Sequence, residues 1–280
     1  GLTRQTLTCR IICCYLVQFG PLLALEVLLN TSDHKKFSMR AICLWSGPRN
    51  VSTAVMYSFA QRPDTCVVDE PLYGHFLRVT GAPHPGREEV MASVDCDGDK
   101  VMKNLLTHSI SNTDLLFMKQ MAHHLVGVNR SFLSGTENIF LIRDPEYMLP
   151  SLTRNLPSAQ LSDTGLKVQW DLFEELMSRG QTPAVIESNQ LLLEPERVLC
   201  KLCEHLGIEF FDEMLTWDAG PRSEDGIWAK YWYQNVHQST GFTSNSPKGR
   251  FPKHLSDLLA ECRPWYDKLC QHAISADNGG

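Results

Sequence analysis

Short apolar runs alternate along this chain with longer segments of helical spacing. Each run ends at a polar turn, and several of these turns contain Gly or Pro, so the runs are typical of buried strands. Strands are expected at residues 41–45, 65–68, 115–121, 138–142 and 183–186. Helical spacing is found at residues 52–61, 165–179, 195–206 and 253–272. A polar stretch, residues 81–100, and an aromatic, irregular region, residues 217–242, separate some of these elements.

Strands that alternate with helices predict a mostly parallel sheet covered on both faces. We therefore expect an α/β fold with three layers, α/β/α, around a mostly parallel central sheet. The chain has 280 residues, of which 43% are hydrophobic, and one domain of roughly 240 residues can bury its own core. We expect that domain at residues 39–273, with an N-terminal extension at 1–38 and a tail at 274–280.

The extension contains an apolar run, residues 11–29, with the length of a signal anchor. Three residues in the run weaken membrane insertion, namely Gln18, Pro21 and Glu26. We favour an appended segment, because a start at Met39 would leave a complete domain. A membrane anchor and an additional helix remain alternatives.

The charge and the cysteines restrict the function class. A net charge of -6 and a pI of about 5.9 argue against binding nucleic acid through a broad basic surface. The chain has 10 cysteines without regular spacing, which favours a reduced, intracellular protein over a disulfide scaffold. We expect a cytoplasmic protein, with Golgi membrane attachment through residues 11–29 as the alternative. No convincing metal-ligand cluster is visible, so no metal is expected.

The segment SGPRNVST, residues 46–53, has the chemistry of an anion-binding loop. A strand, a tight loop and a helix together present backbone N–H groups at the helix N-terminus. Gly47 permits close backbone approach, and Arg49 offers a guanidinium fork. Ser52 and Thr53 can cap the helix or bind a phosphate. The Walker A lysine is absent, which weakens an ATP- or GTP-hydrolysing function. A plain strand-to-helix turn is the alternative.

A second anion-binding candidate follows the strand at 138–142. Arg143 stands at its carboxyl end, Asp144 is placed to cap the next helix, and Ser151 lies eight residues after the arginine. An arginine at a strand end and a serine on the following helix can hold a phosphate from two sides. The alternative is an ion pair of Arg143 with Asp144 or Glu146.

Together the two segments resemble the sulfotransferase family. That family's 5′-phosphosulfate loop reads Pro-Lys/Arg-Ser-Gly-Thr/Ser-Thr after a strand. The loop here matches at the proline, the basic residue and both hydroxyls, but has Asn50-Val51 in place of Ser-Gly, which bears on the tightness of the turn. Arg143 and Ser151 match the spacing of the family's 3′-phosphate motif. Lys248-Gly249-Arg250 resembles its Gly-containing basic loop, in a different internal order.

A narrower resemblance, over about residues 39–272, is to the sulfotransferase-like domain of plant proteins labelled branched-chain-aminotransferase-like. The segments that carry it are WSGPRNVSTAVMYSFAQR, VVDEPLYGHFLRVTG and WYQNVHQSTGF. The family resemblance implies a P-loop fold and a transferase that moves a sulfuryl group from 3′-phosphoadenosine 5′-phosphosulfate (PAPS), leaving 3′-phosphoadenosine 5′-phosphate (PAP). The narrower resemblance strengthens the fold and the donor more than the reaction. The acceptor is a hydroxyl or amine of a small molecule or carbohydrate. The implied donor-binding residues are Gly47, Pro48, Arg49, Asn50, Val51, Ser52, Thr53, Arg143, Ser151, Lys248, Gly249 and Arg250.

The acceptor hydroxyl needs a general base. Glu70 is the first candidate, because it follows the second strand at the edge where open α/β sheets bind ligands, and the DEPL segment resembles carbohydrate sulfotransferases. The alternative is that Glu70 only caps a turn. Cytosolic family members use a histidine after a strand lysine. Here Lys119 is present, Met121 replaces that histidine, and His123 follows. The catalytic candidates are Arg49, Glu70, Lys119 and His123, with His124 and His108 behind them.

Two other functions remain open. One is a non-catalytic nucleotide-binding protein with the same fold, for which Val51 leaves room. The other is a P-loop kinase or hydrolase, which requires a Mg²⁺ site and a loop lysine. Four rings either line an acceptor or adenine pocket or pack in the core: Trp217, Trp228, Trp232 and Tyr233. The acceptor and the oligomeric state are left undecided, with a homodimer as one option.

Overall fold

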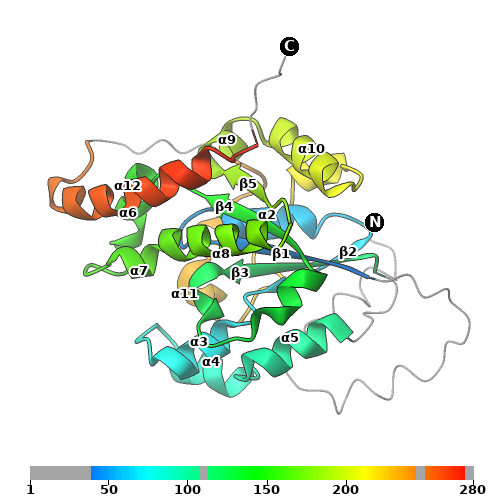
Figure 1. Cartoon of the computed structure of the whole chain (residues 1–280), viewed down its shortest axis with the longest axis horizontal. Helices are drawn as coiled ribbons and strands as arrows, with labels where there is room; N and C mark the ends of the chain where they lie inside the picture. The colour runs from blue at the N-terminus through cyan, green and yellow to red at the C-terminus, as the bar shows by residue number, and fades with distance from the viewer. Residues whose placement is uncertain (1–38, 108–112, 244–249, 275–280) are drawn as a thin grey trace, which may run out of the picture.

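A parallel sheet forms the centre of the molecule. The computed structural model describes residues 39–107, 113–243 and 250–274, and within them the sheet has five strands in the order β2-β3-β1-β4-β5, all parallel (Figure 1). The strands are β1 (Arg40–Ser46), β2 (Thr65–Asp69), β3 (Leu115–Met121), β4 (Glu137–Ile142) and β5 (Ala184–Glu187). Each lies within one residue of its expected bounds. The expected α/β fold is confirmed.

Strand β1 is the central strand, paired with β3 on one side and β4 on the other. The chain proceeds from β1 to β2 and β3 in one direction, and continues through β4 and β5 in the other. In open α/β sheets, ligands bind beyond the carboxyl ends of the strands at such a reversal. The loop after β1 therefore stands at the position that this fold uses for binding.

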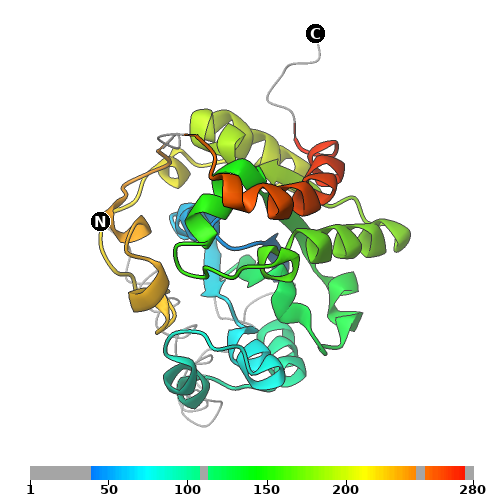
Figure 2. The same cartoon turned by 90° about the vertical axis from the view of Figure 1, so that its left-hand side faces the viewer.

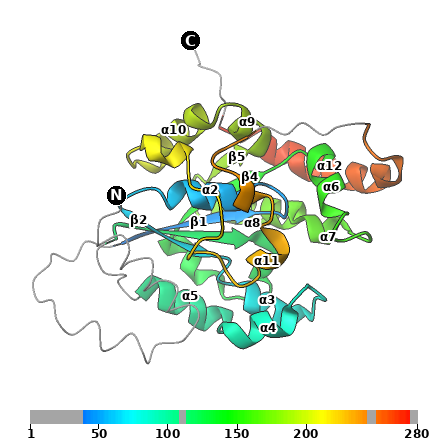
Figure 3. The same cartoon turned by 180° about the vertical axis from the view of Figure 1, so that it is seen from behind.

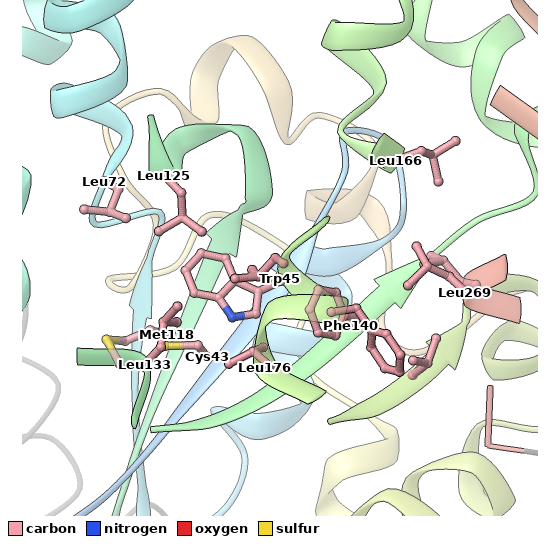
Figure 4. Packing of buried hydrophobic residues seen from close by; sticks show 14 of the residues in the cluster. Cys43, Trp45, Leu72, Met118, Leu125, Leu133, Phe140, Leu166, Leu176 and Leu269 are labelled. Carbon is pink, nitrogen blue, oxygen red and sulfur yellow. The ribbon is translucent and has the colours of Figure 1, made fainter. Parts of the chain in front are cut away.

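One face of the sheet is covered by α5 (Gly98–Thr107), α6 (Pro145–Leu152), α8 (Leu166–Ser178) and α12 (Ser256–Cys270). Figure 4 shows how Cys43 and Trp45 of β1 pack beside Met118 of β3 and Phe140 of β4 on this face. The opposite face, seen from behind in Figure 3, is covered by α2 (Ser52–Phe59) and α10 (Pro195–Leu206). Because both faces are buried, the strands are mostly apolar rather than alternating, and polar residues within them, such as Lys119 and Gln120 of β3, are buried as well.

The remaining elements surround these layers. They are α3 (Tyr73–Thr80), α4 (Arg87–Ser93), η1 (Ala122–Leu125), η2 (Arg130–Gly135), α7 (Leu161–Thr164), α9 (Ser188–Leu193), η3 (Asp212–Leu215), α11 (Ala229–Trp232), η4 (Val236–Gln238) and η5 (Lys253–Leu255). Figure 2 shows α3, α4 and α5 in cyan tones together at one end of the molecule. The polar stretch at 81–100 thus contains α4 and the start of α5.

The aromatic region at 217–242 forms a strap over the α2 side of the sheet. Its two ends meet in an antiparallel bridge between Thr216 and Gly241. In its middle, Asp225 accepts a hydrogen bond from the Tyr57 hydroxyl of α2 at 2.6 Å, and His237 contacts the same carboxylate at 2.8 Å. The strap is therefore fastened to the helix that follows the 46–53 loop.

In the described part of the chain, every helix is too short or too polar to cross a membrane. The extension 1–38, including the run at 11–29, lies outside the described residues.

Candidate functional site

The 46–53 loop contains two residues in the left-handed backbone region. Arg49 has φ 62° and Val51 has φ 61°. Val51 is the N-cap of α2 and provides no side-chain cap, and the buried Ser52 begins the helix. The turn is therefore kept although valine stands where the family loop has glycine. A β-branched residue in this region is strained by about 1–2 kcal/mol.

Gly47 is required by a neighbouring segment. A Cβ atom at this position would lie 2.4 Å from the carbonyl oxygen of Thr164, at the end of α7. The sequence predicted close backbone approach at Gly47, and the approach seen here is to the turn between α7 and α8. That contact holds the beginning of the loop in place.

The two predicted anion-binding segments meet beside this loop. Nη1 of Arg143 donates a hydrogen bond to the carbonyl oxygen of Arg49 at 2.7 Å. Nε of Arg49 donates to Oγ of Ser151 at 2.9 Å. Two segments about 100 residues apart in the chain are thus in direct contact.

The carboxylates proposed as alternative partners of Arg143 are bound by another arginine. Arg263 of α12 forms ion pairs of 3.1 Å with Asp144 and 3.1 Å with Glu146. Asp144 is also the N-cap of α6, as predicted, and accepts from the backbone N–H of Glu146. Within the described ranges, neither Arg49 nor Arg143 has a carboxylate oxygen within 4.0 Å.

Burial lowers the pKa of both guanidinium groups. For Arg49 the second cause is the nearby charge of Arg154. For Arg143, Glu187 opposes the effect of burial and Arg49 adds to it. The Nε atom of Arg143 is buried, and no hydrogen-bond acceptor for it lies in the described part of the chain. Buried donors and cations without partners are costly, so these groups fit an anionic ligand.

Two polar side chains tie the loop to the neighbouring strands. Nδ2 of Asn50 donates to the carbonyl oxygen of Leu141 at 3.0 Å. The Ser188 hydroxyl, at the start of α9, contacts the carbonyl oxygens of Asn50 at 2.9 Å and Ile142 at 2.7 Å. The loop is therefore held before any ligand binds.

A buried group of charged residues lies at the carboxyl ends of β2 and β3. The Lys119 side chain is fully buried and forms ion pairs of 2.8 Å with Asp69 and 2.7 Å with Glu70. It also donates to the Tyr233 hydroxyl, which comes from the strap. The parallel register places Asp69 opposite Lys119, so pairing of the two strands brings lysine and carboxylate together.

Glu70 is strained and almost buried. Its φ is 39°, although it is not a glycine, and 7% of the residue is exposed. Burial raises the pKa of Glu70, the ammonium group of Lys119 lowers it, and the carboxylate of Asp69 raises it further. Strain of this kind is concentrated at functional sites, which supports Glu70 as a candidate.

The histidines predicted as alternative bases lie in a cluster of rings. His124 stacks on Tyr73 with 5.1 Å and on Phe76 with 4.6 Å between ring centroids, and its Nδ1 lies 4.0 Å from Oε2 of Glu70. Burial lowers the pKa of His123 to about 4 and that of His124 well below its ordinary value. Both imidazoles are therefore neutral at pH 7, and His108 lies outside the described residues.

Of the four aromatic residues predicted to line a pocket or pack in the core, three are buried and one is partly exposed. Trp217, Trp228 and Tyr233 are buried, and Trp232 is partly exposed beside His84. The Tyr233 hydroxyl, which the sequence offered only as part of a ring, contacts a lysine 114 positions away. Arg250 is exposed, while Lys248 and Gly249 lie outside the described residues.

Residues 39–273 match the model of the family described as Sulfotransferase domain. Two proteins of Arabidopsis thaliana are similar to this chain. Branched-chain-amino-acid aminotransferase-like protein 2 is 39% identical over 236 residues, which are 84% of this chain and 42% of that protein. Branched-chain-amino-acid aminotransferase-like protein 1 is 42% identical over 229 residues, 81% of this chain and 41% of that protein.

This chain therefore spans less than half the length of those two relatives. Among solved structures, the sulfotransferase domain from the Synechococcus PCC 7002 olefin synthase is similar with a TM-score of 0.46 and 16% identity. The match covers 83% of this chain and 97% of that domain.

Proposed function

This chain belongs to the sulfotransferase domain family, and from that premise we propose that it transfers a sulfuryl group from PAPS to an acceptor hydroxyl or amine. The acceptor is a small molecule or a carbohydrate, and PAP is the other product. The resemblance to the plant aminotransferase-like group is confirmed by the two relatives. The donor, the reaction and the residue roles are our proposal.

The observation that carries the proposal is the contact between Arg49 and Arg143. The guanidinium group of Arg143 contacts the backbone of Arg49, and the charge of Arg49 acts on it. Neither arginine has a carboxylate partner in the described ranges, and the buried Nε of Arg143 lacks an acceptor there. A ligand with phosphate groups at two positions would neutralise both. The fit rests on these donors and on the N-terminus of α2.

Each donor group has a proposed role. Arg49 and the first turn of α2, with Ser52 and Thr53, bind the 5′-phosphate end. Arg143 and Ser151 bind the 3′-phosphate, and the loop Lys248-Gly249-Arg250 is added to them on the resemblance alone. When bound, PAPS supplies an activated sulfuryl group. Positioned cations and N–H groups stabilise the charge that develops on the leaving phosphate.

Glu70 is proposed as the general base. A bond forms between the acceptor oxygen and sulfur, the bond between sulfur and the 5′-phosphate oxygen breaks, and the acceptor proton passes to Glu70. A carboxylate whose pKa is raised by burial is a better base near neutral pH than an exposed one. His123 is the second candidate, because its imidazole is neutral at pH 7, but burial lowers its pKa to about 4 and makes it the weaker base.

Ligand-dependent thermal stability tests the proposal. PAP without Mg²⁺ should stabilise the protein by about 2.7 kcal/mol at roughly 100 times its Kd, which corresponds to about 5–10 °C in Tm for a domain of this size. ATP with Mg²⁺ should have little effect, because the loop lacks the Walker lysine. The measurement is a thermal melt with each ligand.

Other outcomes identify the alternatives. Equal stabilisation by ATP with Mg²⁺ would favour a kinase or hydrolase. Binding of PAP with no transfer of label from radioactive PAPS to any component of a cell extract would favour the non-catalytic nucleotide-binding protein.

A further inference from the structure

The buried group at the ends of β2 and β3 contains two adjacent carboxylates, one lysine and one tyrosine hydroxyl. We propose that Tyr233 is a positioning residue which, with Asp69, fixes Lys119 so that Glu70 alone keeps a carboxylate oxygen for the acceptor proton. This inference rests on the proposed function, and it assigns different roles to Asp69 and Glu70.

Lys119 uses all of its hydrogen-bond donors. Its ammonium group has three protons, and Nζ contacts Oδ1 of Asp69 at 2.8 Å, Oε1 of Glu70 at 2.7 Å and the Tyr233 oxygen. The side chain is fully buried. Since losing any partner would leave a buried donor unsatisfied, the lysine has one stable position.

The Tyr233 hydroxyl likewise has a hydrogen-bond partner for its proton and for both of its lone pairs. It has one proton to donate and two lone pairs to accept. Lys119 donates to it, and Nε1 of Trp228 donates at 3.3 Å. Its own proton goes to Asp69, whose oxygens lie at 2.8 and 2.9 Å, rather than to Glu70 at 3.3 Å.

Asp69 is therefore occupied by donors from three sides. Besides Lys119 and Tyr233, the backbone N–H of Gly226 donates to its Oδ2 at 3.2 Å. Glu70 differs, because among the described residues the hydrogen-bond donors contact its Oε1, while Oε2 faces Nδ1 of His124 at 4.0 Å. The carboxylate with a less occupied oxygen is the one able to take a proton.

The position of the strap explains how Tyr233 reaches this group. Tyr57 and His237 bind Asp225, and Gly226 binds Asp69, so the strap is fixed at both α2 and β2. The groups that face Glu70 come from several elements: Asp69 of β2, Lys119 of β3, Tyr233 of the strap, His124 of η1 and Tyr73 of α3.

Two substitutions should move the pH dependence in opposite directions. Tyr233→Phe removes a donor near the carboxylates and loosens Lys119, so Glu70 should keep its proton to higher pH. In the pH profile of kcat/KM, the loss of activity on the acidic side should move to a pH about one unit higher, and kcat should fall about tenfold. Asp69→Asn removes the adjacent negative charge, so this loss of activity should move to lower pH.

Tyr231→Phe is the matched control. Tyr231 is on the same strap, but its hydroxyl donates to Glu89 at the surface, at 3.2 Å. This variant should keep the parent's pH profile, and KM for PAPS should stay within about twofold in all three variants because the arginines are unchanged. A role in packing alone would lower activity without moving the pH profile.

A titration of Glu70 separates this inference from the proposed function. In protein with ¹³C-labelled glutamate carboxyls, the Glu70 resonance is assigned by its loss in Glu70→Gln and followed by NMR against pH. Opposite shifts in Tyr233→Phe and Asp69→Asn support the inference even if the parent transfers no sulfuryl group, a result that would reject only the proposed function. The inference is overturned if Glu70 titrates at the parent's pH in either variant while the circular dichroism of that variant equals the parent's. If Tyr233→Phe does not fold, Asp69→Asn decides alone.

Discussion

A hydrogen bond joins Arg143 to the backbone of Arg49, and among the described residues one nitrogen of each guanidinium group donates to the protein. Nη1 of Arg143 donates a hydrogen bond to the carbonyl oxygen of Arg49, and Nε of Arg49 donates one to Oγ of Ser151. The positive charge of Arg49 contributes to the lowered pKa of Arg143, and burial strengthens such repulsion between like charges. The arrangement is therefore less stable without a bound anion than with one.

Replacing each arginine should separate binding from transfer. Arg143→Ala should weaken PAP binding by about 10–100-fold, because charge-assisted hydrogen bonds contribute about 1.5–3 kcal/mol. Arg49→Ala should lower kcat by about 100-fold, because a positioned donor to the developing charge is lost. Calorimetric PAP titration and transfer of labelled sulfuryl measure the two effects.

Arg197→Ala is the control for these variants, since Arg197 pairs with Glu194 on the exposed side of α10 at 3.2 Å. It should bind PAP and turn over as the parent does. Parental PAP affinity in both Arg49→Ala and Arg143→Ala would show that the donor site lies elsewhere.

At the scale of elements, the loop after β1 is held by its neighbours. The turn between α7 and α8 packs against Gly47, and Ser188 at the start of α9 contacts the carbonyl oxygen of Asn50. These contacts come from segments more than 100 residues further along the chain. They stabilise a turn that contains two left-handed residues.

Gly47→Ala should therefore disturb both the fold and the site. The added methyl group would meet the Thr164 carbonyl oxygen at 2.4 Å, so the backbone of one segment must move. We expect a loss of about 1–3 kcal/mol in the free energy of unfolding, together with weaker PAP binding.

Urea denaturation and PAP titration measure this effect. Gly135→Ala is the control, because nothing lies within 4 Å of a Cβ at that position. Equal stability of Gly47→Ala and Gly135→Ala would mean that the α7–α8 turn moves away without cost.

Across the whole molecule, the carboxyl edge of the sheet has two chemically different halves. The arginines follow β1 and β4, whereas the carboxylates, the lysine and the histidines lie at the carboxyl ends of β2 and β3 or directly after them. Because β1 lies between β3 and β4, an anion on one half would lie next to an acid–base group on the other. This order suits transfer between a phosphorylated donor and an acceptor.

The histidine cluster should make stability depend on pH. Burial, followed by the neighbouring histidines and Lys119, keeps the pKa of His124 well below its ordinary value of 6.5 in the folded state. Below that pH the unfolded chain binds a proton that the folded protein does not, so the parent loses stability as pH falls. His124→Phe preserves the stacking and removes the titration. Its stability relative to the parent should rise by about 1 kcal/mol between pH 7 and 5.5.

Urea unfolding of both proteins at the two pH values tests this prediction. Since the other titrating groups are shared, they cancel in the difference. Parallel pH dependence would mean that His124 is protonated within the fold.

Local pattern was sufficient for the strands and for the order of strands and helices, and it placed the two segments predicted to bind anions directly after β1 and β4. Apolar runs report burial on both faces of a sheet, and Asp144 caps its helix through neighbours in the chain. The position of Glu70 at a strand end was also predictable, because the carboxyl ends of parallel strands share one edge.

Only the tertiary structure decided how these groups are paired. Tyr233 reaches Lys119 across 114 residues, Arg263 binds the carboxylates expected beside Arg143, and the Thr164 carbonyl explains Gly47. Such contacts depend on strand order and on the return of the strap over the sheet, which periodicity along the chain does not encode. Burial, which keeps the imidazoles neutral and raises the pKa of Glu70, likewise exists only after the layers have packed.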